Sequence, residues 1–294
     1  MSLRTGLLRL KRDPRVKLYY RVAGVNSSDA KTIVLSNSLS SACDVLWKEF
    51  EDFFGSKYRL ILYDQRFHGN SPLIEKDSVF DYYGRGLRFE QYADDVVELL
   101  DHLGVARAAA LVGLSMGATT AVIAMGRHGD RFDRIIAAGS GLKSDEVGAK
   151  VFEERVKFVE MNGMSALAPL TMARWFPGES GASFLVDNPG RASELTEMLN
   201  EAHAEGLVSA VRALQHYDLT TSLECIRRRE VGHKVLLIAG SEDGPLPVVN
   251  SKMSELGGTG LAIIKGSGHL VNIQRSTEFN RAVDEFLASD SKLT

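Results

Sequence analysis

Ser115 lies at the centre of the segment Gly113-Leu114-Ser115-Met116-Gly117, which follows a short apolar run and opens a helical pattern. At this spacing a serine occupies a sharp strand-to-helix turn, and the residues two before and two after it must be nearly free of side chain. The turn lifts the hydroxyl above a sheet and leaves the backbone N–H of Met116 at a helix N-terminus, where an oxyanion can bind. The spacing predicts a nucleophilic serine; the alternative is a turn with a purely structural role.

A nucleophilic serine needs a general base, and two of the seven histidines lie in loops that follow an expected strand. His269 follows the last such strand, in Gly266-Ser267-Gly268-His269, where the chain order serine, acid, histidine places the base. His68 also lies in a loop after a strand and is the one serious rival. The other five lie in or beside helical patterns or just before a strand, so we expect His269 to be the base.

The acid that orients the base should follow a strand between the serine and the histidine. Asp243, in the segment 239–245 (Ala-Gly-Ser-Glu-Asp-Gly-Pro), comes three to four residues after such a strand. Its neighbour Glu242 is the alternative acid, whereas the loop after the preceding strand, 139–143, holds no acid. A carboxylate here would fix the imidazole tautomer and stabilise the imidazolium, so Asp243 is the predicted partner of the base.

Strand-length apolar runs alternate with helical patterns along most of the chain. The runs are 7–10, 16–22, 32–35, 58–63, 108–112, 135–138, 234–239 and 260–264. Amphipathic helical patterns cover 89–103, which is followed by Gly104, and 277–288. Short runs that are apolar throughout suit a parallel sheet covered on both faces. We therefore expect an α/β fold whose mostly parallel central sheet has helices on both faces.

The alternation stops between residues 144 and 225. This stretch holds helical patterns at 151–161, 193–203 and 207–214 and no convincing strand. We interpret it as a helical cap that is inserted before the penultimate strand. The predicted organisation is therefore an α/β core, made of residues 1–143 and 226–294, with a cap at 144–225.

The composition of the 294-residue chain excludes several classes of partner. Its 35 basic and 38 acidic residues give a formal charge of −3. The chain therefore lacks the excess of positive charge that is typical of proteins that bind nucleic acid or an anionic membrane. Two cysteines, Cys43 and Cys225, cannot form a disulfide framework, and with no secretory signal visible they favour a cytoplasmic location. A phosphate-binding glycine loop, a His-Glu-x-x-His motif and a Cys/His cluster are all lacking, so neither a cofactor nor a metal is expected.

One uncharged segment, 108–126, is long enough to span a bilayer. It contains Ser115, Thr119, Thr120 and three glycines, and no aromatic belt flanks it. A buried strand, a tight turn and a buried helix in succession explain the same pattern. We therefore expect this segment to lie inside the fold and not in a membrane.

Four segments carry a resemblance to a known family. They are 35–40 (Leu-Ser-Asn-Ser-Leu-Ser), 63–71 (Tyr-Asp-Gln-Arg-Phe-His-Gly-Asn-Ser), 113–117 and 173–176 (Ala-Arg-Trp-Phe). With them the chain resembles the α/β-hydrolase family from about Val16 to its end, and within that family it is most similar to the 3-oxoadipate enol-lactonase group. The general motifs indicate the superfamily, and the segments 35–40 and 173–176 indicate the group.

The resemblance implies a catalytic triad of Ser115, Asp243 and His269. It also implies an oxyanion hole made by the backbone N–H groups of Leu39 and Met116. The three members of the triad are the residues that spacing already indicated, whereas Leu39 depends on the resemblance alone.

In this family the histidine of the segment 63–71 is structural, which removes His68 as a base. The chain departs from the family in the same segment, because Phe67 stands where glycine is usual. This departure leaves the shape of the loop open and does not affect the expected triad.

Arg174 and Trp175 are expected to bind the substrate, because the equivalent cap residues of the lactonase group lie near it. Ser38, from the segment 35–40, is also expected to bind the substrate. A guanidinium could clamp a carboxylate through two hydrogen bonds. The alternative is that Arg174 stacks on an aromatic ring while Trp175 and Phe176 pack into the cap.

The leading hypothesis is hydrolysis of a lactone or ester, in particular of a small carboxylate-bearing lactone, with Ser115 as the nucleophile. A carbon–carbon bond hydrolase and a general carboxylesterase are alternatives on the same scaffold, because a fold does not fix a function. A further alternative is a non-catalytic ligand-binding protein that keeps the fold and an unused triad.

Overall fold

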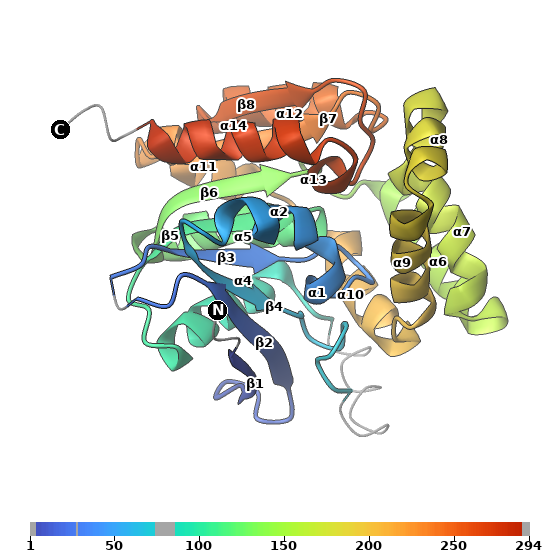
Figure 1. Cartoon of the computed structure of the whole chain (residues 1–294), viewed down its shortest axis with the longest axis horizontal. Coiled ribbons are helices and arrows are strands. Elements are labelled where there is room, and N and C mark those ends of the chain that lie inside the picture. The colour runs from blue at the N-terminus through green and yellow to red at the C-terminus, as the bar shows by residue number, and fades with distance from the viewer. Residues whose placement is uncertain (1–3, 28, 74–85, 290–294) are drawn as a thin grey trace.

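The computed structural model describes residues 4–27, 29–73 and 86–289. In these ranges eight strands form one sheet in the order β1-β2-β4-β3-β5-β6-β7-β8 (Figure 1). The strands are β1 (Arg4–Arg9), β2 (Lys17–Gly24), β3 (Thr32–Ser36), β4 (Arg59–Tyr63), β5 (Ala108–Leu114), β6 (Phe132–Ala138), β7 (Val235–Gly240) and β8 (Gly260–Ile264). β2 is antiparallel to β1 and β4, and every other neighbouring pair is parallel. The predicted mostly parallel sheet is confirmed, with one strand at each apolar run.

Helices cover both faces of this sheet. Those around it are α1 (Cys43–Leu46), α2 (Lys48–Phe54), α4 (Phe89–His102), α5 (Met116–His128), α11 (Thr220–Arg228), α12 (Leu246–Gly257), α13 (Val271–Gln274) and α14 (Ser276–Ala288). Successive strand residues point to opposite faces, so Val34 belongs to the apolar core with α4 and α5, and Leu35 to the core with α1, α2 and α14. Since both faces are buried, the strands must be apolar throughout.

Between β6 and β7 the chain forms a helical insertion, α6–α10. Its helices are α6 (Glu146–Asn162), α7 (Met164–Trp175), α8 (Gly178–Asp187), α9 (Pro189–Asn200) and α10 (Ala204–His216). α6, α7 and α10 share a small apolar cluster, and α6–α9 lie beyond one end of the sheet (Figure 1). The predicted helical patterns fall on α6, α9 and α10, whereas α7, which contains Pro169, and α8 were not predicted.

α11 belongs with the helices around the sheet, because it packs against α5 and α12. Its span, Thr220–Arg228, crosses residue 225, the predicted limit of the cap. The division of the chain into core and cap stays a prediction.

The uncharged segment 108–126 consists of β5, the turn at Ser115 and most of α5. The prediction of a strand, a turn and a helix in succession is therefore confirmed. Within the described ranges, no helix combines the length and the apolar character that crossing a membrane requires.

The carboxyl ends of the parallel strands meet at one edge of the sheet, the edge at which ligands bind in open α/β folds. The loops that follow β3, β5, β7 and β8 carry, in turn, Leu39, Ser115, Asp243 and His269. Ser36 of β3 pairs in register with Gly113 of β5, so the end of β3 lies against the turn of Ser115. α6–α9 lie beyond this edge (Figure 1).

Candidate active site

Ser115 has a strained backbone conformation that close packing maintains. Its φ and ψ are 56° and −110°, and its N–H donates to the carbonyl oxygen of Ala138 over 2.7 Å. A Cβ on Gly113 would lie 2.1 Å from the carbonyl oxygen of Gly117, and a Cβ on Gly117 would lie 2.1 Å from that of Ser36. Both glycines are required by these close approaches, as the spacing predicted, and the turn sets Ser115 at the N-terminus of α5.

Asp243 and His269 form a buried hydrogen-bonded pair. The Nδ1–H of His269 donates to Oδ2 of Asp243 over 2.7 Å. Burial lowers the pKa of His269 from its ordinary value of 6.5, and the positive charge of Arg174 lowers it further, against the opposing effect of Asp243. The imidazole is therefore neutral near pH 7, which is the form that a general base needs.

Ser115 and His269 are not joined by a hydrogen bond. Nε2 of His269 is buried, and it has no hydrogen-bond partner among the residues that the structure describes. Catalytic hydrogen bonds are often long before substrate binds and tighten in the complex. This unpaired Nε2 is the atom through which His269 could accept a serine proton.

The loop of His269 also contacts the helical insertion. The backbone N–H of His269 donates to the carbonyl oxygen of Trp175, at the end of α7, over 2.9 Å. A Cβ on Gly268 would lie 2.6 Å from the same oxygen and 2.2 Å from Cδ of Pro177. Since only a glycine permits this approach, the position of His269 depends on the insertion as well as on the sheet.

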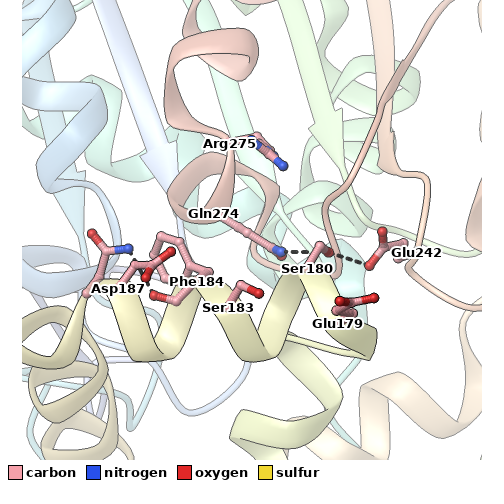
Figure 2. A pocket seen from close by; sticks show the side chains of 9 residues that line it. Glu179, Ser180, Ser183, Phe184, Asp187, Glu242, Gln274 and Arg275 are labelled. Atoms are coloured by element: carbon pink, nitrogen blue, oxygen red, sulfur yellow. Dashed lines mark hydrogen bonds between the residues drawn. The ribbon is translucent and has the colours of Figure 1, made fainter.

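Glu242, the alternative acid, has a different partner. Its Oε2 accepts a hydrogen bond from Ser180 of α8, and Nε2 of Gln274 donates to the same Ser180 hydroxyl over 3.2 Å (Figure 2). Oε1 of Gln274 in turn accepts from the N–H of Gly268 over 2.8 Å. These side chains line a groove of about 600 Å³ that connects α8 with the loops after β7 and β8. The structure thus pairs the imidazole with Asp243 and places Glu242 against α8.

His68, the rival base, has no carboxylate partner in the described part of the chain. Its Nδ1 lies 2.8 Å from the carbonyl oxygen of Arg66, and burial lowers its pKa to about 4.

The preceding Phe67 has a φ of 65°, a left-handed conformation that glycine adopts without strain. Its ring is buried in the core and its carbonyl oxygen lies close to Gly206 of α10, so packing holds this unusual backbone.

Leu39 and Met116 carry the backbone N–H groups that the resemblance assigns to an oxyanion hole. Neither N–H donates to another described residue. Beside Leu39, the hydroxyl groups of Ser38 and Ser40 are buried, and each lacks a hydrogen-bond partner in the described ranges. This loop therefore presents several polar groups that a ligand could satisfy.

Asn37 and Asp64 join the segments 35–40 and 63–71 beneath this loop. Nδ2 of Asn37 donates to Oδ1 of Asp64 over 2.9 Å, and the N–H of Cys43 donates to the same oxygen over 2.7 Å. Burial raises the pKa of Asp64 to about 6. The network fixes the end of β3 and thus the position of Leu39.

Arg174 lines a small cavity beneath the insertion, and the indole of Trp175 does not. The cavity has a volume of about 20 Å³, and its lining includes Leu39, Ser40 and Arg174. Trp175 is fully buried in an apolar core with Phe176, and among the described residues its Nε1 has no hydrogen-bond partner. Trp175 reaches the site through its carbonyl oxygen, which accepts from His269.

The strained serine turn and the buried acid–base pair lie in a chain that matches a known family over most of its length. Residues 31–276 match the model of the alpha/beta hydrolase fold. The chain belongs to this family. The resemblance that the sequence indicated is therefore confirmed.

The relatives of this alpha/beta hydrolase include enol-lactonases. The chain is 30% identical over 272 residues to 3-oxoadipate enol-lactonase 2 of Acinetobacter baylyi (strain ATCC 33305 / BD413 / ADP1), with 92% of each chain covered. It is 26% identical over 280 residues to RutD of Caulobacter sp. (strain K31), a relative named for carbamate hydrolysis, with 93% of this chain and 97% of RutD covered. The crystal structure of the enol-lactonase from Burkholderia xenovorans LB400 matches with a TM-score of 0.80 and 26% identity, over 96% of this chain and 99% of that one.

One charged residue at the site of this alpha/beta hydrolase was missed by sequence reasoning. Arg155 of α6 lines the same cavity as Arg174. It lies in an amphipathic helical pattern, where an arginine usually indicates a solvent-facing position, so no local signal marks it.

Within the described ranges, no group of three or more histidine, cysteine, aspartate and glutamate side chains could hold a metal ion.

Proposed function

We propose that this alpha/beta hydrolase is a serine hydrolase that cleaves a small lactone or ester by acyl transfer. The observation that carries the proposal is the buried Asp243–His269 pair, which lies at the sheet edge where a strained turn holds Ser115. Nε2 of this histidine has no hydrogen-bond partner among the described residues. A serine on such a turn, an imidazole and a carboxylate are the components of nucleophilic acyl transfer.

His269 acts as the general base and then as the general acid. Nε2 removes the proton of Ser115 while Oγ attacks the carbonyl carbon, and the imidazolium then gives this proton to the leaving oxygen. In a lactone the leaving oxygen remains attached to the acyl chain, so the ring opens on the enzyme. Water activated by the same nitrogen then hydrolyses the ester on Ser115, and Asp243 stabilises the imidazolium in both steps.

Two backbone N–H groups stabilise the negative charge that develops on the carbonyl oxygen. Met116 is the first residue of α5, so its N–H and the helix dipole both favour an anion there. Leu39 supplies the second N–H from the loop after β3. The hydroxyl of Ser38, next to Leu39, has no hydrogen-bond partner in the described part of the chain and gains one when substrate binds.

A carboxylate on the substrate is supported by Arg174, which lines the cavity together with Leu39. Together with the enol-lactonase relatives, this favours a small carboxylate-bearing lactone. Trp175 contributes through the carbonyl oxygen that holds His269. In this proposal α6–α10 act as a cap over the site.

A carbamate is the second candidate substrate, because one relative is named for carbamate hydrolysis. The same serine could attack a carbamate carbonyl. General carboxylesterase activity and carbon–carbon bond hydrolysis use the same triad and are separated only by substrate preference.

A substrate panel tests the proposal. We expect the highest kcat/KM on an enol-lactone, compared with an aryl ester, a carbamate and a diketone, and a fall of about 10⁶-fold in kcat in Ser115→Ala. A preference for the carbamate or the diketone would overturn the substrate class. A loss of less than about tenfold in Ser115→Ala would overturn the serine mechanism, and one release of product without turnover would indicate a ligand-binding protein.

A further inference from the structure

Two arginines of the helical insertion, Arg155 of α6 and Arg174 of α7, line the same small cavity. Leu39 and Ser40, from the loop after β3, line it as well. Because the cavity measures only about 20 Å³, a substrate must displace the side chains around it. A substrate that enters this cavity would therefore contact both arginines.

Neither arginine forms an ion pair in the part of the chain that the structure describes. Nε of Arg174 is buried and has no hydrogen-bond partner in that part. The guanidinium of Arg155 lies over the ring of Phe152, with Cζ 5.6 Å from the ring centroid. Burial lowers the pKa of both arginines, and repulsion from Arg155 helps to lower the pKa of Arg174 to about 10.

Asp243 is the carboxylate whose charge acts favourably on Arg174. Its Oδ2, however, already accepts the hydrogen bond of His269. Two cationic residues therefore line one cavity, and the carboxylate whose charge favours Arg174 already accepts the hydrogen bond of the imidazole. Burial of unpaired charge is costly, so the charge balance of this region favours an anionic ligand.

We propose that Arg155 joins Arg174 in binding a substrate carboxylate remote from the scissile carbonyl, which makes Arg155 a further specificity-determining residue. The inference rests on the proposed function, which places the reacting carbonyl at Ser115. Guanidinium groups bind carboxylates through charge-assisted hydrogen bonds of fixed geometry. A substrate without this carboxylate leaves both cations unpaired and is bound less well.

The experiment compares two substrates that differ only in the remote charge, mono(4-nitrophenyl) adipate and its methyl ester. Wild-type protein should prefer the acid in kcat/KM, and Arg155→Met should reduce this preference by about 10- to 100-fold, since a charge-assisted hydrogen bond is lost. Lys157→Gln, which removes a positive charge from the exposed side of α6, is the matched control and should keep the wild-type preference. The rate on the methyl ester reports whether Arg155→Met is folded.

An unchanged preference for the acid in Arg155→Met would overturn the inference. So would an equal loss on both substrates, because it would indicate that Arg155 only supports the fold. Calorimetry with adipate and the Ser115→Ala protein separates this inference from the proposed function. Saturable binding of adipate to the Ser115→Ala protein, lost when Arg155→Met is added, would support the subsite. Full turnover by Ser115→Ala would overturn the proposed function alone.

Discussion

The backbone N–H of His269 donates to the carbonyl oxygen of Trp175 over 2.9 Å, while its imidazole donates to Asp243 over 2.7 Å. The proposed base is therefore held from two sides, by the helical insertion through its backbone and by the loop after β7 through its ring. Arg174 immediately precedes Trp175 in α7 and lines the small cavity. The end of α7 thus holds the proposed base through Trp175 and contributes Arg174 to the lining of the cavity.

Replacing Asp243 and Glu242 in turn tests which of these two neighbouring carboxylates is the acid that orients His269. Asp243→Asn should lower kcat on an aryl ester by about 10³–10⁴-fold, because an amide neither favours the required imidazole tautomer nor stabilises the imidazolium. The matched change Glu242→Gln alters a carboxylate that accepts from Ser180, and it should cost less than about tenfold. A larger loss for Glu242→Gln than for Asp243→Asn would contradict the assignment.

The pH dependence of kcat/KM on a neutral ester reports the titration of His269. Because its pKa is lowered, the neutral base persists as the pH falls, and the acid limb of the profile should have its midpoint below 6.5. Arg174→Met removes a positive charge that disfavours the imidazolium, so the pKa should rise and the midpoint should move upward. Lys157→Gln should leave the midpoint in place. A downward shift in Arg174→Met would be inconsistent with this electrostatic coupling.

The turn that holds Ser115 predicts a large difference between two glycine-to-alanine changes. Gly117→Ala brings a Cβ to 2.1 Å from the carbonyl oxygen of Ser36 and should lower the free energy of unfolding by about 1–3 kcal/mol or more, with loss of activity. Gly190→Ala places a Cβ in open space on α9 and should be neutral or stabilise by about 0.5–1 kcal/mol. Urea unfolding measures both, and equal midpoints would contradict the close approach.

Gln274 connects the histidine loop with α8, because it accepts a hydrogen bond from the N–H of Gly268 and donates one to Ser180. Figure 2 shows the bond to Ser180. Gln274→Leu leaves the buried N–H of Gly268 without an acceptor, which should lower the free energy of unfolding by about 1–3 kcal/mol. It should also lower kcat, because Gly268 directly precedes His269. Ser183→Ala, on the exposed side of the same groove, is the control and should change neither quantity. Wild-type stability and kcat in Gln274→Leu would show that this connection is dispensable.

The serine turn was predictable because both glycines that it requires lie within two residues of Ser115. Gly113 and Gly117 approach backbone within a few residues of Ser115 and at the end of β3, so a five-residue pattern reports the conformation. Asp243 and His269 are 26 residues apart in the sequence. Their proximity could be predicted only from the order of the strands, which places both residues at one edge of the sheet. The sequence left Glu242 open as the acid, since loop geometry decides which of two adjacent carboxylates meets the imidazole.

Contacts made by the insertion could not be predicted from local patterns. Arg155 has the spacing of a solvent-facing residue, and its place at the cavity depends on how α6 packs against α7 and α10. The contact of Trp175 with His269 uses a backbone carbonyl, which no side-chain pattern reports. Phe67 keeps a left-handed backbone because its ring is buried in the core, an effect of tertiary packing.

Trapping of an acyl-enzyme is the most direct test of Ser115 as the nucleophile. Protein mixed with a 4-nitrophenyl ester is quenched in acid within one turnover, digested and examined by mass spectrometry. The predicted result is one acyl group per chain on the peptide that contains Ser115, and none in Ser115→Ala. An acyl group on another residue of the wild-type protein, or turnover by Ser115→Ala at the wild-type rate, would contradict the proposed function.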